Sequence, residues 1–331
     1  MTQADEQRPY ISIILTGRND NFGGDFNDRL FRALEFNHEH LTQRGIPHEF
    51  VFCEWRPVSG RPWLAEVLAD RYPDLVPTSL ASYVADVAYH DAFSLNPTLQ
   101  FQEFIAKNIG IRRCRGAFIL TTNTDIYLSR GLLDVLEQRA LAPRVLYRSA
   151  RIDLKDGIES ERLGWAVLED ERNYAFVNHM KPPFYTNASG DFLLLDGDSY
   201  RELRGFNEVY RVAKVHMDSN FCRKAYASGL TLTPLDAPVY HVGLGTLNSQ
   251  KGLYADRPCD APWGNTRWNH EVVYANDDNW GLWRAPATSV RSGLHFLEFT
   301  WATVPPLVAL RRIELPVTET TAAGTDSARV D

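Results

Sequence analysis

Two oxygen-bearing side chains stand one residue apart at the end of an apolar segment. Residues 117–121 are mainly apolar, and Asn123, Thr124 and Asp125 follow closely. In an extended chain, residues i and i+2 project to the same side, so Asn123 and Asp125 can face one ion. Amide and carboxylate oxygens suit hard cations such as Mg2+ or Mn2+, and such a cation could hold a diphosphate. By itself, an Asn-x-Asp triplet is more typical of an ordinary Asx turn.

The composition is that of an ordinary globular protein. The chain has 331 residues, of which 44% are hydrophobic, and a net charge of -7. This length allows one large core or two modest ones. The negative charge and the lack of any Lys/Arg-rich run argue against nucleic acid as a partner.

Cysteine usage and hydropathy predict a cytoplasmic location. The four cysteines are far apart and lack C-x-x-C spacing, so they signal neither a zinc site nor a disulfide framework. Residues 1–9 have no apolar stretch typical of a signal peptide. No segment approaches the roughly 20 apolar residues that span a bilayer.

Two hydrophobic periodicities alternate in the first 125 residues. Strands are predicted at residues 10–16, 47–54, 80–85 and 117–121, and helices at 28–44, 61–72 and 99–115. This alternation predicts an α/β fold, Rossmann-like, with a mostly parallel sheet flanked by helices. No Gly-x-Gly-x-x-Gly follows the first strand and no Walker lysine motif occurs, which excludes those two phosphate sites. Ligands of such sheets bind at the carboxyl ends of the strands, where residues 17–20, 54–56 and 123–125 lie.

The pattern changes after Asp125. We predict helices at residues 131–141, 198–203 and 218–228, strands at 144–152 and 239–242, and an irregular stretch at 153–183. Periodicity fades over 243–286, where Trp263, Trp268 and Trp280 occur among polar residues. An amphipathic helical region is predicted at 289–312. The predicted organisation is a domain at 1–245, a Trp-rich loop and helical extension at 246–312, and a disordered tail at 313–331.

Six short motifs occur in a consistent order between about residues 10 and 245. They are Thr16-Gly-Arg-Asn-Asp20, Glu54-Trp-Arg-Pro57, Thr121-Thr-Asn-Thr-Asp125, Asn187-Ala-Ser-Gly-Asp191, Gly205-Phe-Asn-Glu208 and Tyr240-His-Val242. Together they resemble the GT-A fold glycosyltransferases of the family 2 kind. The resemblance implies a nucleotide-sugar donor, most commonly a UDP-sugar, bound by residues 10–130. It implies that residues 131–245 receive a hydroxyl acceptor, such as a glycan, a lipid-linked sugar or a small natural product, with inversion at the sugar.

By position in the resembling family, each motif carries an expected role. Gly17, Arg18 and Asn19 match the nucleotide-binding loop after the first strand, and Glu54 matches an acidic residue that meets the base. Asn123 and Asp125 match the family's Asp-x-Asp metal position. Asn123 replaces the first aspartate and so removes one negative charge from the predicted Mn2+ or Mg2+ site.

Further residues have two readings each. Asp218 opens a predicted helix, either as an N-cap or as the general base that deprotonates the acceptor hydroxyl, with Glu208 as the rival base. Asp191 either caps a strand or contacts the donor sugar. His241 is either a structural residue or a third ligand of the metal or phosphate. The three tryptophans are core groups or acceptor-stacking groups.

Two other function classes remain open from the sequence. A sugar nucleotidyltransferase also binds phosphates through a divalent ion, although residues 17–20 lack its Gly-rich signature. A non-catalytic protein that binds nucleotide-sugars or carbohydrates is the other alternative, left open by Asn123. The apolar residues of 294–310 suggest two alternatives for this predicted helix. One is weak contact with a membrane surface, and the other, which is commoner, is packing on its own domain. The oligomeric state is not predicted.

Overall fold

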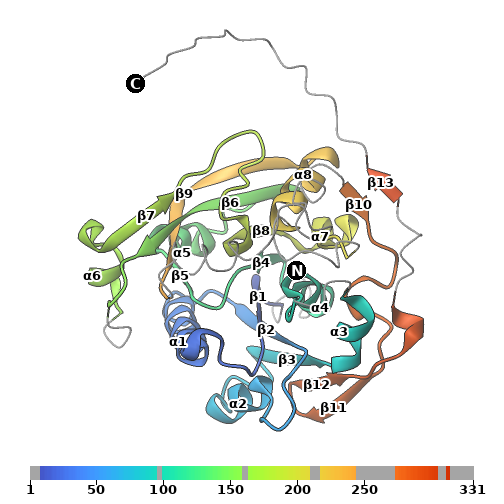
Figure 1. The fold of residues 1–331 in the computed structure, drawn as a ribbon. Helices are drawn as coiled ribbons and strands as arrows, with labels where there is room; N and C mark the ends of the chain where they lie inside the picture. The colour runs from blue at the N-terminus through green and yellow to red at the C-terminus, as the bar shows by residue number, and fades with distance from the viewer. Residues whose placement is uncertain are drawn as a thin grey trace, which may run out of the picture.

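The chain folds around one large mixed sheet. The computed structural model describes residues 8–94, 99–158, 163–208, 217–243, 273–304 and 311–313. Eleven strands form the main sheet, and helices pack on both of its faces (Figure 1). A separate two-stranded sheet joins β10 (Val273–Ala275) to β13 (Arg311–Ile313). The predicted α/β class is therefore confirmed.

The first half of the chain forms the predicted parallel sheet. Its strands are β1 (Ile11–Gly17), β2 (His48–Trp55), β3 (Leu80–Ala85) and β4 (Phe118–Thr121). β1 pairs in parallel with β2 and β4, and β2 pairs in parallel with β3. The helices are α1 (Phe26–Gln43), α2 (Leu64–Arg71), α3 (Val87–Phe93) and α4 (Glu103–Arg113). Every strand and helix predicted in this half is confirmed, whereas α3 and a short 3-10 helix at Phe22–Gly24 were not predicted.

The second half makes the sheet mixed rather than mostly parallel. β8 (Leu193–Asp196) runs antiparallel to both β4 and β6 (Val145–Leu154). β6 is parallel to β9 (Thr231–His241), and β5 (Ile126–Leu128) is antiparallel to β9. β7 (Tyr174–Asn178) adds an antiparallel partner to β6 within the stretch predicted as irregular. The prediction of a mostly parallel sheet is therefore corrected for this half. β8, β5 and β7 run opposite to their neighbours, and antiparallel neighbours do not need the crossover connection that parallel strands require.

Four helices of the second half flank these strands. Three match predicted helices, α5 (Arg130–Glu137), α7 (Gly197–Leu203) and α8 (Met217–Ala227), whereas α6 (Trp165–Leu168) lies in the stretch predicted as irregular. Successive strand residues face opposite sides of the sheet: Ile14 and Ile119 pack towards α4 and α8, whereas Ile13 and Leu120 pack towards α1, α2 and α5. Burial on both faces explains why these strands read as continuous apolar runs.

The predicted amphipathic helix at 289–312 is wrong over its described part. Residues there form the hairpin of β11 (Ala287–Arg291) and β12 (Leu294–Leu297), and β12 extends the main sheet beside β3 (Figure 1). Leu294 is buried and Phe296 stacks on Trp63 at 5.3 Å, so the apolar positions follow the period of a strand. The surface helix behind the predicted membrane contact is therefore not formed within 289–304.

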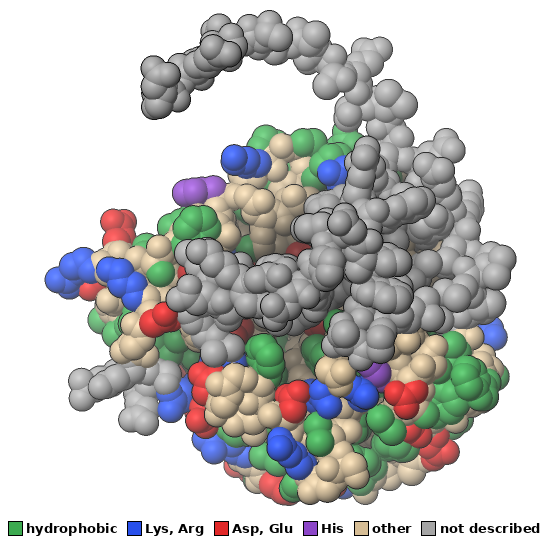
Figure 2. Space-filling model, in the orientation of Figure 1, with side chains coloured by type: hydrophobic (Ala, Val, Ile, Leu, Met, Phe, Trp, Pro, Cys, Tyr) green, Lys and Arg blue, Asp and Glu red, His purple; other side chains and the backbone are tan. Residues whose placement is uncertain are grey.

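Other sequence predictions fall outside the described residues. These include Trp263, Trp268 and the tail at 314–331. Among the described helices, none combines the length and apolarity required to cross a bilayer. Acidic and basic side chains are interspersed over the described part of the face in Figure 2.

The Gly205-Phe-Asn-Glu208 motif has a packing role in this fold. Gly205 has a φ of +63°, and a Cβ there would clash with Asn108 and lie 2.7 Å from the Trp280 ring. The Asn108 amide donates to the Phe206 carbonyl at 2.8 Å, and its oxygen accepts the Phe206 N–H at 2.8 Å. The motif thereby fastens the chain after α7 onto the buried side of α4.

Substitution of Gly205 tests this packing role. Gly205→Ala is expected to lower the free energy of unfolding by about 3 kcal/mol or more, since a side chain adds a steric clash to the cost of positive φ. Gly229→Ala is the matched control, because Gly229 has a φ of +78° with open space around it. The control is expected to cost only about 1 to 2 kcal/mol. Urea denaturation measures both, and equal costs would rule out the steric account.

Candidate active site

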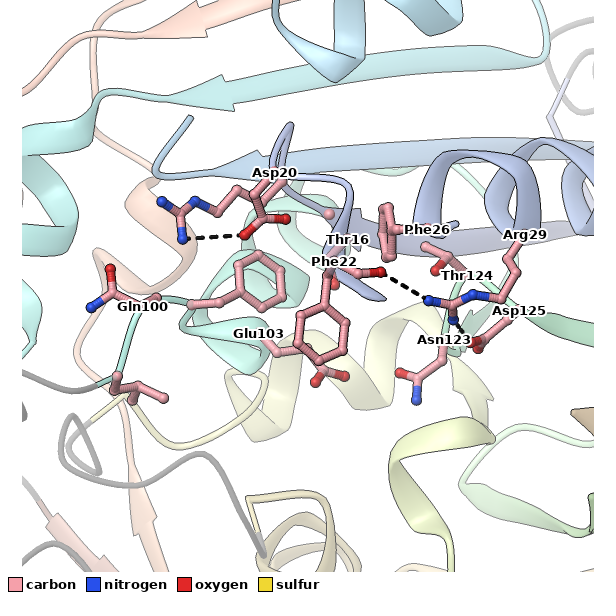
Figure 3. Close-up of a pocket in the computed structure, with 14 residues that line it drawn as sticks. Thr16, Asp20, Phe22, Phe26, Arg29, Gln100, Glu103, Asn123, Thr124 and Asp125 are labelled. Carbon is pink, nitrogen blue, oxygen red and sulfur yellow. Dashed lines mark hydrogen bonds and ion pairs between the residues drawn. The ribbon is translucent and has the colours of Figure 1, made fainter. Parts of the chain in front are cut away.

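A cavity of about 390 Å3 opens at the carboxyl ends of β1 and β4 (Figure 3). The loop after β1 contributes Gly17, Arg18 and Asp20, and the loop after β4 contributes Asn123, Thr124 and Asp125. Aromatic side chains complete part of the wall: Phe22, Phe26 and Phe101. Two of the three strand ends that the sequence singled out thus line the cavity, and the third lies beside the first, where Arg18 Nε donates to the Arg56 carbonyl at 2.9 Å.

Asp125 is the carboxylate at the centre of this wall. Its Oδ2 lies 2.5 Å from Nη1 of Arg29, which reaches it from α1. The same oxygen lies 3.4 Å from Nε2 of His241 at the end of β9. Burial favours the neutral acid, but the charges of His241 and Arg29 hold the pKa of Asp125 well below its usual range. Asp125 is therefore a buried anion with two cationic partners.

His241 is held between two carboxylates. Its Nδ1 lies 2.9 Å from Oδ1 of Asp153, opposite the Nε2 contact with Asp125. Burial lowers the pKa of His241, but the two carboxylates outweigh burial and raise the pKa to about 10. The imidazole is thus protonated at neutral pH, and both ring nitrogens are engaged. The metal-ligand role predicted for His241 stays a prediction.

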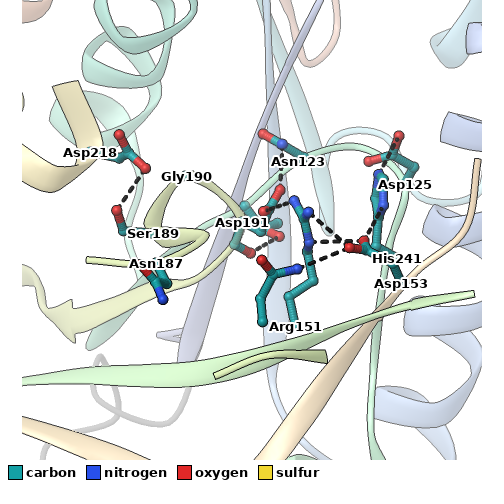
Figure 4. A network of polar contacts seen from close by, with 12 residues as sticks. Asn123, Asp125, Arg151, Asp153, Asn187, Ser189, Gly190, Asp191, Asp218 and His241 are labelled. Atoms are coloured by element: carbon teal, nitrogen blue, oxygen red, sulfur yellow. Dashed lines mark hydrogen bonds and ion pairs between the residues drawn. The ribbon is translucent and has the colours of Figure 1, made fainter. Parts of the chain in front are cut away.

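A chain of polar contacts continues from His241 to Asp191 (Figure 4). Asp153 faces His241 because the two residues are in register across β6 and β9. Arg151 stands two residues earlier on β6, and its Nη2 donates to Oδ2 of Asp153 at 3.0 Å. Its Nη1 lies 2.5 Å from Oδ2 of Asp191. Asp191 is buried, so Arg151 fixes its carboxylate beneath the cavity wall.

Asn123 links the same carboxylate to the cavity. Its amide nitrogen donates to Oδ1 of Asp191 at 2.5 Å, while its oxygen accepts from Nζ of Lys107 at 3.2 Å. Lys107 is fully buried on α4 and also binds Oε1 of Glu103 at 2.7 Å and the Gly190 carbonyl at 3.0 Å. Asn123 therefore bridges a cation and an anion of the protein, because its amide group both donates and accepts hydrogen bonds.

Asp218 lies beside the turn that carries Asp191. Ser189, the first residue of the short helix η4 (Ser189–Asp191), donates through its hydroxyl to Oδ2 of Asp218 on α8 at 2.6 Å (Figure 4). Gly190 stands between Ser189 and Asp191, and a Cβ at Gly190 would lie 3.5 Å from Oδ2 of Asp218. The predicted base and the predicted sugar-binding carboxylate are therefore neighbours, although more than twenty residues separate them in sequence.

Three predicted residues have structural partners away from the cavity wall. Glu208 is buried, and its Oε1 accepts from Asn108 at 2.9 Å and from the Gly281 N–H at 2.8 Å. The Asn19 oxygen accepts the Val58 N–H at 2.6 Å. Asn19 therefore braces the loop after β2. Its contact with a nucleotide, and the base role of Glu208, stay predictions.

Glu54 is the third of these residues. It is fully buried and accepts the Ala65 N–H at 2.9 Å, at the start of α2. Burial raises the pKa of its carboxyl from 4.5 to about 7, against the opposing effect of backbone hydrogen bonds. Glu54 does not line the cavity. Its contact with a nucleotide base stays a prediction.

The donor set on the cavity wall fits a divalent cation that is shared with a phosphate-bearing ligand. Asp125 and Asn123 offer one carboxylate and one amide oxygen. Within the described residues, no group of three or more His, Cys, Asp or Glu side chains is arranged to hold an ion. Magnesium-type sites commonly combine one or two carboxylates with phosphate oxygens and water. The remaining ligands would thus come from the substrate.

Sequence reasoning missed Arg29, Lys107, Arg151 and Asp153. Each is a charged residue inside an element whose neighbours are buried, as Arg151 and Asp153 are in β6. The spacing of Arg151 and Asp153, two charged residues in an otherwise buried strand, could have indicated a buried ion-pair network, because buried charges need partners. Which partner each one finds could not be read from the chain.

No protein-family model matches the sequence. No curated protein matches it either. Among solved structures, the chain is similar to GalNAc-T7 with UDP, GalNAc and Mn2+, at 12% identity over 80% of this chain and 48% of that chain, with a TM-score of 0.49. The chain thus spans about half the length of that protein.

Two further solved structures are similar in shape. The catalytic domain of Drosophila β1,4-galactosyltransferase 7 in complex with xylobiose matches 87% of this chain and 92% of its own, at 9% identity and a TM-score of 0.43. TarS of S. aureus, residues 1–349, matches 74% of this chain and 62% of its own, at 13% identity and a TM-score of 0.39. With TM-scores below 0.5, these likenesses add no evidence for the activity of this chain.

The raised pKa of Glu54 gives a pH-dependent prediction. Between pH 4.5 and 7 the folded protein keeps a proton that the unfolded chain has lost, so this group's contribution to stability falls as pH rises through that window. Glu54→Gln keeps an oxygen that can accept the Ala65 N–H and cannot ionise. The variant is expected to be more stable than the wild type at pH 8 by about 1 to 3 kcal/mol, with the gain vanishing near pH 5.

Chemical denaturation at pH 5, 6, 7 and 8 measures this difference. Glu171→Gln serves as the control, because Glu171 is exposed and should show no such pH dependence. A Glu54→Gln variant less stable than the wild type at pH 8 would show that the buried carboxylate is stabilised by its surroundings.

Proposed function

We propose that the protein is a GT-A-type glycosyltransferase that moves a sugar from a nucleoside diphosphate donor to a hydroxyl acceptor with inversion. UDP is the expected nucleotide, because it is the commonest in the family that the motifs resemble. The observation that carries the proposal is the link from the cavity wall to two carboxylates: Asn123 contacts Asp191, and Ser189 of the same turn contacts Asp218. The residues proposed to bind the phosphate, to bind the sugar and to act as the base are therefore neighbours.

The cavity supports binding of the donor. Its volume of about 390 Å3 lies within the usual range for small-molecule sites. Arg18 and Arg29 line it with guanidinium groups, which suit the two oxygens of a phosphate. Phe22 and Phe101 offer aromatic faces on which a base can stack.

Asp125 and Asn123 are the residues that would hold a divalent cation, with Mn2+ and Mg2+ both acceptable to oxygen ligands. A bound cation would stabilise the negative charge that develops on the diphosphate leaving group. Asp191, held by Arg151 and Asn123, is proposed to fix the hydroxyls of the donor sugar.

Asp218 is proposed as the general base. One of its oxygens is fixed by Ser189 at 2.6 Å, which orients the carboxylate. Asp218 would take the proton of the acceptor hydroxyl while that oxygen forms a bond to the anomeric carbon. The bond from the anomeric carbon to the diphosphate oxygen breaks, and the diphosphate leaves with its electron pair. Glu208 is less suited to this role, because its carboxylate is bonded within a buried cluster with Asn108 and Gly281.

The proposed activity is tested by incubating the full chain with a panel of nucleotide-sugars and hydroxyl acceptors. Release of nucleoside diphosphate together with a glycosylated product supports the proposal. Pyrophosphate release from a nucleoside triphosphate and a sugar phosphate, without nucleoside diphosphate, would instead identify a nucleotidyltransferase. Calorimetric binding of a nucleotide-sugar with no turnover across the panel would identify a binding protein.

Loss of the base should separate binding from chemistry. Asp218→Asn is expected to lower kcat by about 100-fold or more, because amide groups do not accept the proton. The affinity for the donor should stay unchanged in calorimetry. Asp236→Asn, at an exposed position of β9, is the control with wild-type kcat. Near wild-type turnover of Asp218→Asn would refute the assignment.

Loss of the cavity-wall carboxylate should abolish transfer. Asp125→Ala removes the carboxylate of the Asn123/Asp125 pair and leaves Arg29 and His241 without their shared partner. Removing one member of a buried ion pair costs about 3 to 5 kcal/mol, so folding is checked by circular dichroism and thermal melting. A folded Asp125→Ala protein with wild-type transfer would exclude Asp125 from the site.

A further inference from the structure

Both oxygen-bearing side chains of the predicted metal position already have cationic partners within the protein. Nη1 of Arg29 lies 2.5 Å from Oδ2 of Asp125 (Figure 3), and Nζ of Lys107 lies 3.2 Å from Oδ1 of Asn123. The Arg29 and Asp125 side chains are 9% and 10% exposed, so water screens this pair only weakly. The position that the sequence reserves for a metal is thus electrostatically satisfied by the chain itself.

Arg29 is fixed in this place by three separate groups. Besides Asp125, its Nε donates to Oδ1 of Asp25 at 3.1 Å and its Nη2 donates to the Phe22 carbonyl at 3.2 Å. Phe22 and Arg29 both line the cavity. The guanidinium is therefore preorganised at the boundary between Asp125 and the space that a ligand would fill (Figure 3).

The carboxylates around the site have matching cations. Asp153 and Asp191 share Arg151, and Glu103 pairs with Lys107. Of this group, Asp125 and Glu103 line the cavity, and Asp125 has Arg29 and His241 as its cationic partners. A divalent cation that enters alone meets the positive charge of Arg29 and must disrupt a buried ion pair, which is costly.

A diphosphate changes this balance. It brings negative oxygens into the cavity on the side where Arg29 already lies, and a guanidinium pairs well with phosphate. Arg29 can then share its charge between Asp125 and the phosphates, and the cation gains phosphate ligands in addition to Asp125. Arg29 and Asp125 therefore favour binding of the cation together with the diphosphate over binding of the cation alone.

We propose that Arg29 is the internal counter-ion of Asp125 in the nucleotide-free protein, so that a divalent cation binds only together with a nucleoside diphosphate. The requirement for a nucleoside diphosphate rests on the proposed function. The role of Arg29 as counter-ion, and its effect on binding of the metal alone, rest on the contacts of Arg29.

The test measures binding of Mn2+ by the full chain, through loss of the free-ion signal in electron paramagnetic resonance and through calorimetry. For the wild type, UDP is expected to increase the affinity for Mn2+ by at least about 10-fold. Arg29→Gln is expected to bind Mn2+ without nucleotide at least about 10-fold more tightly than the wild type, because one of the two cationic partners of Asp125 is gone while His241 remains.

Two further variants guard the interpretation. Arg29→Lys keeps the positive charge and is expected to bind Mn2+ alone as weakly as the wild type. Arg71→Gln removes an exposed arginine of α2 that pairs with Glu35, a residue of the helix α1 that also carries Arg29. This variant is expected to bind Mn2+ as the wild type does. If Arg29→Gln does not fold, as judged by circular dichroism, the comparison of the Mn2+ affinity of the wild type with and without UDP still decides the proposal.

Two results would overturn the proposal. One is a wild-type protein that binds Mn2+ equally tightly with and without UDP. The other is a folded Arg29→Gln protein with no gain in affinity for Mn2+ alone. If no nucleoside diphosphate binds the wild type under any condition, the proposed function fails, while the comparison of Mn2+ binding between wild type and Arg29→Gln still decides the role of Arg29.

Discussion

A buried line of alternating charges holds the candidate site together. It runs through Arg29, Asp125, His241, Asp153, Arg151 and Asp191, with each member within ion-pair distance of the next. These residues come from α1, the loop after β4, β9, β6 and η4. Burial of an unpaired charge is costly, so each element is constrained to stay where its partner needs it. The geometry of the cavity wall therefore depends on segments that never reach the cavity.

The sheet makes this line of charges feasible. β8 joins the two halves by pairing antiparallel with β4, which places the turn of Asp191 beside Asn123. The register of β6 and β9 sets Asp153 opposite His241, and strand geometry sends Arg151 to the same side as Asp153. A slip of one residue in β6 would turn both side chains to the other face. Backbone register thus determines which charges meet.

Several motif residues support the site instead of facing it. Asn19 braces the loop after β2, Glu54 caps the start of α2, and Asn108 fastens the Gly205–Glu208 segment to α4. All are polar groups buried with hydrogen-bond partners, as burial requires. A residue type that fits a ligand-binding role fits equally well as a partner for backbone groups, which explains why the ordered motifs locate the site better than they assign individual roles.

The sequence by itself determined the α/β class, nearly every element of the first half, and the gathering of residues 17–20 and 123–125 at one edge, because hydrophobic period and strand ends are local properties. It misread 289–304 as a helix, since the apolar positions of two short strands interrupted by a turn imitate helical spacing. Only the tertiary structure decided that β12 lies beside β3, that part of the sheet is antiparallel, and that Arg29 neutralises Asp125. Those outcomes depend on long-range pairing and on the matching of buried charges, and neither is encoded in the spacing of residues along the chain.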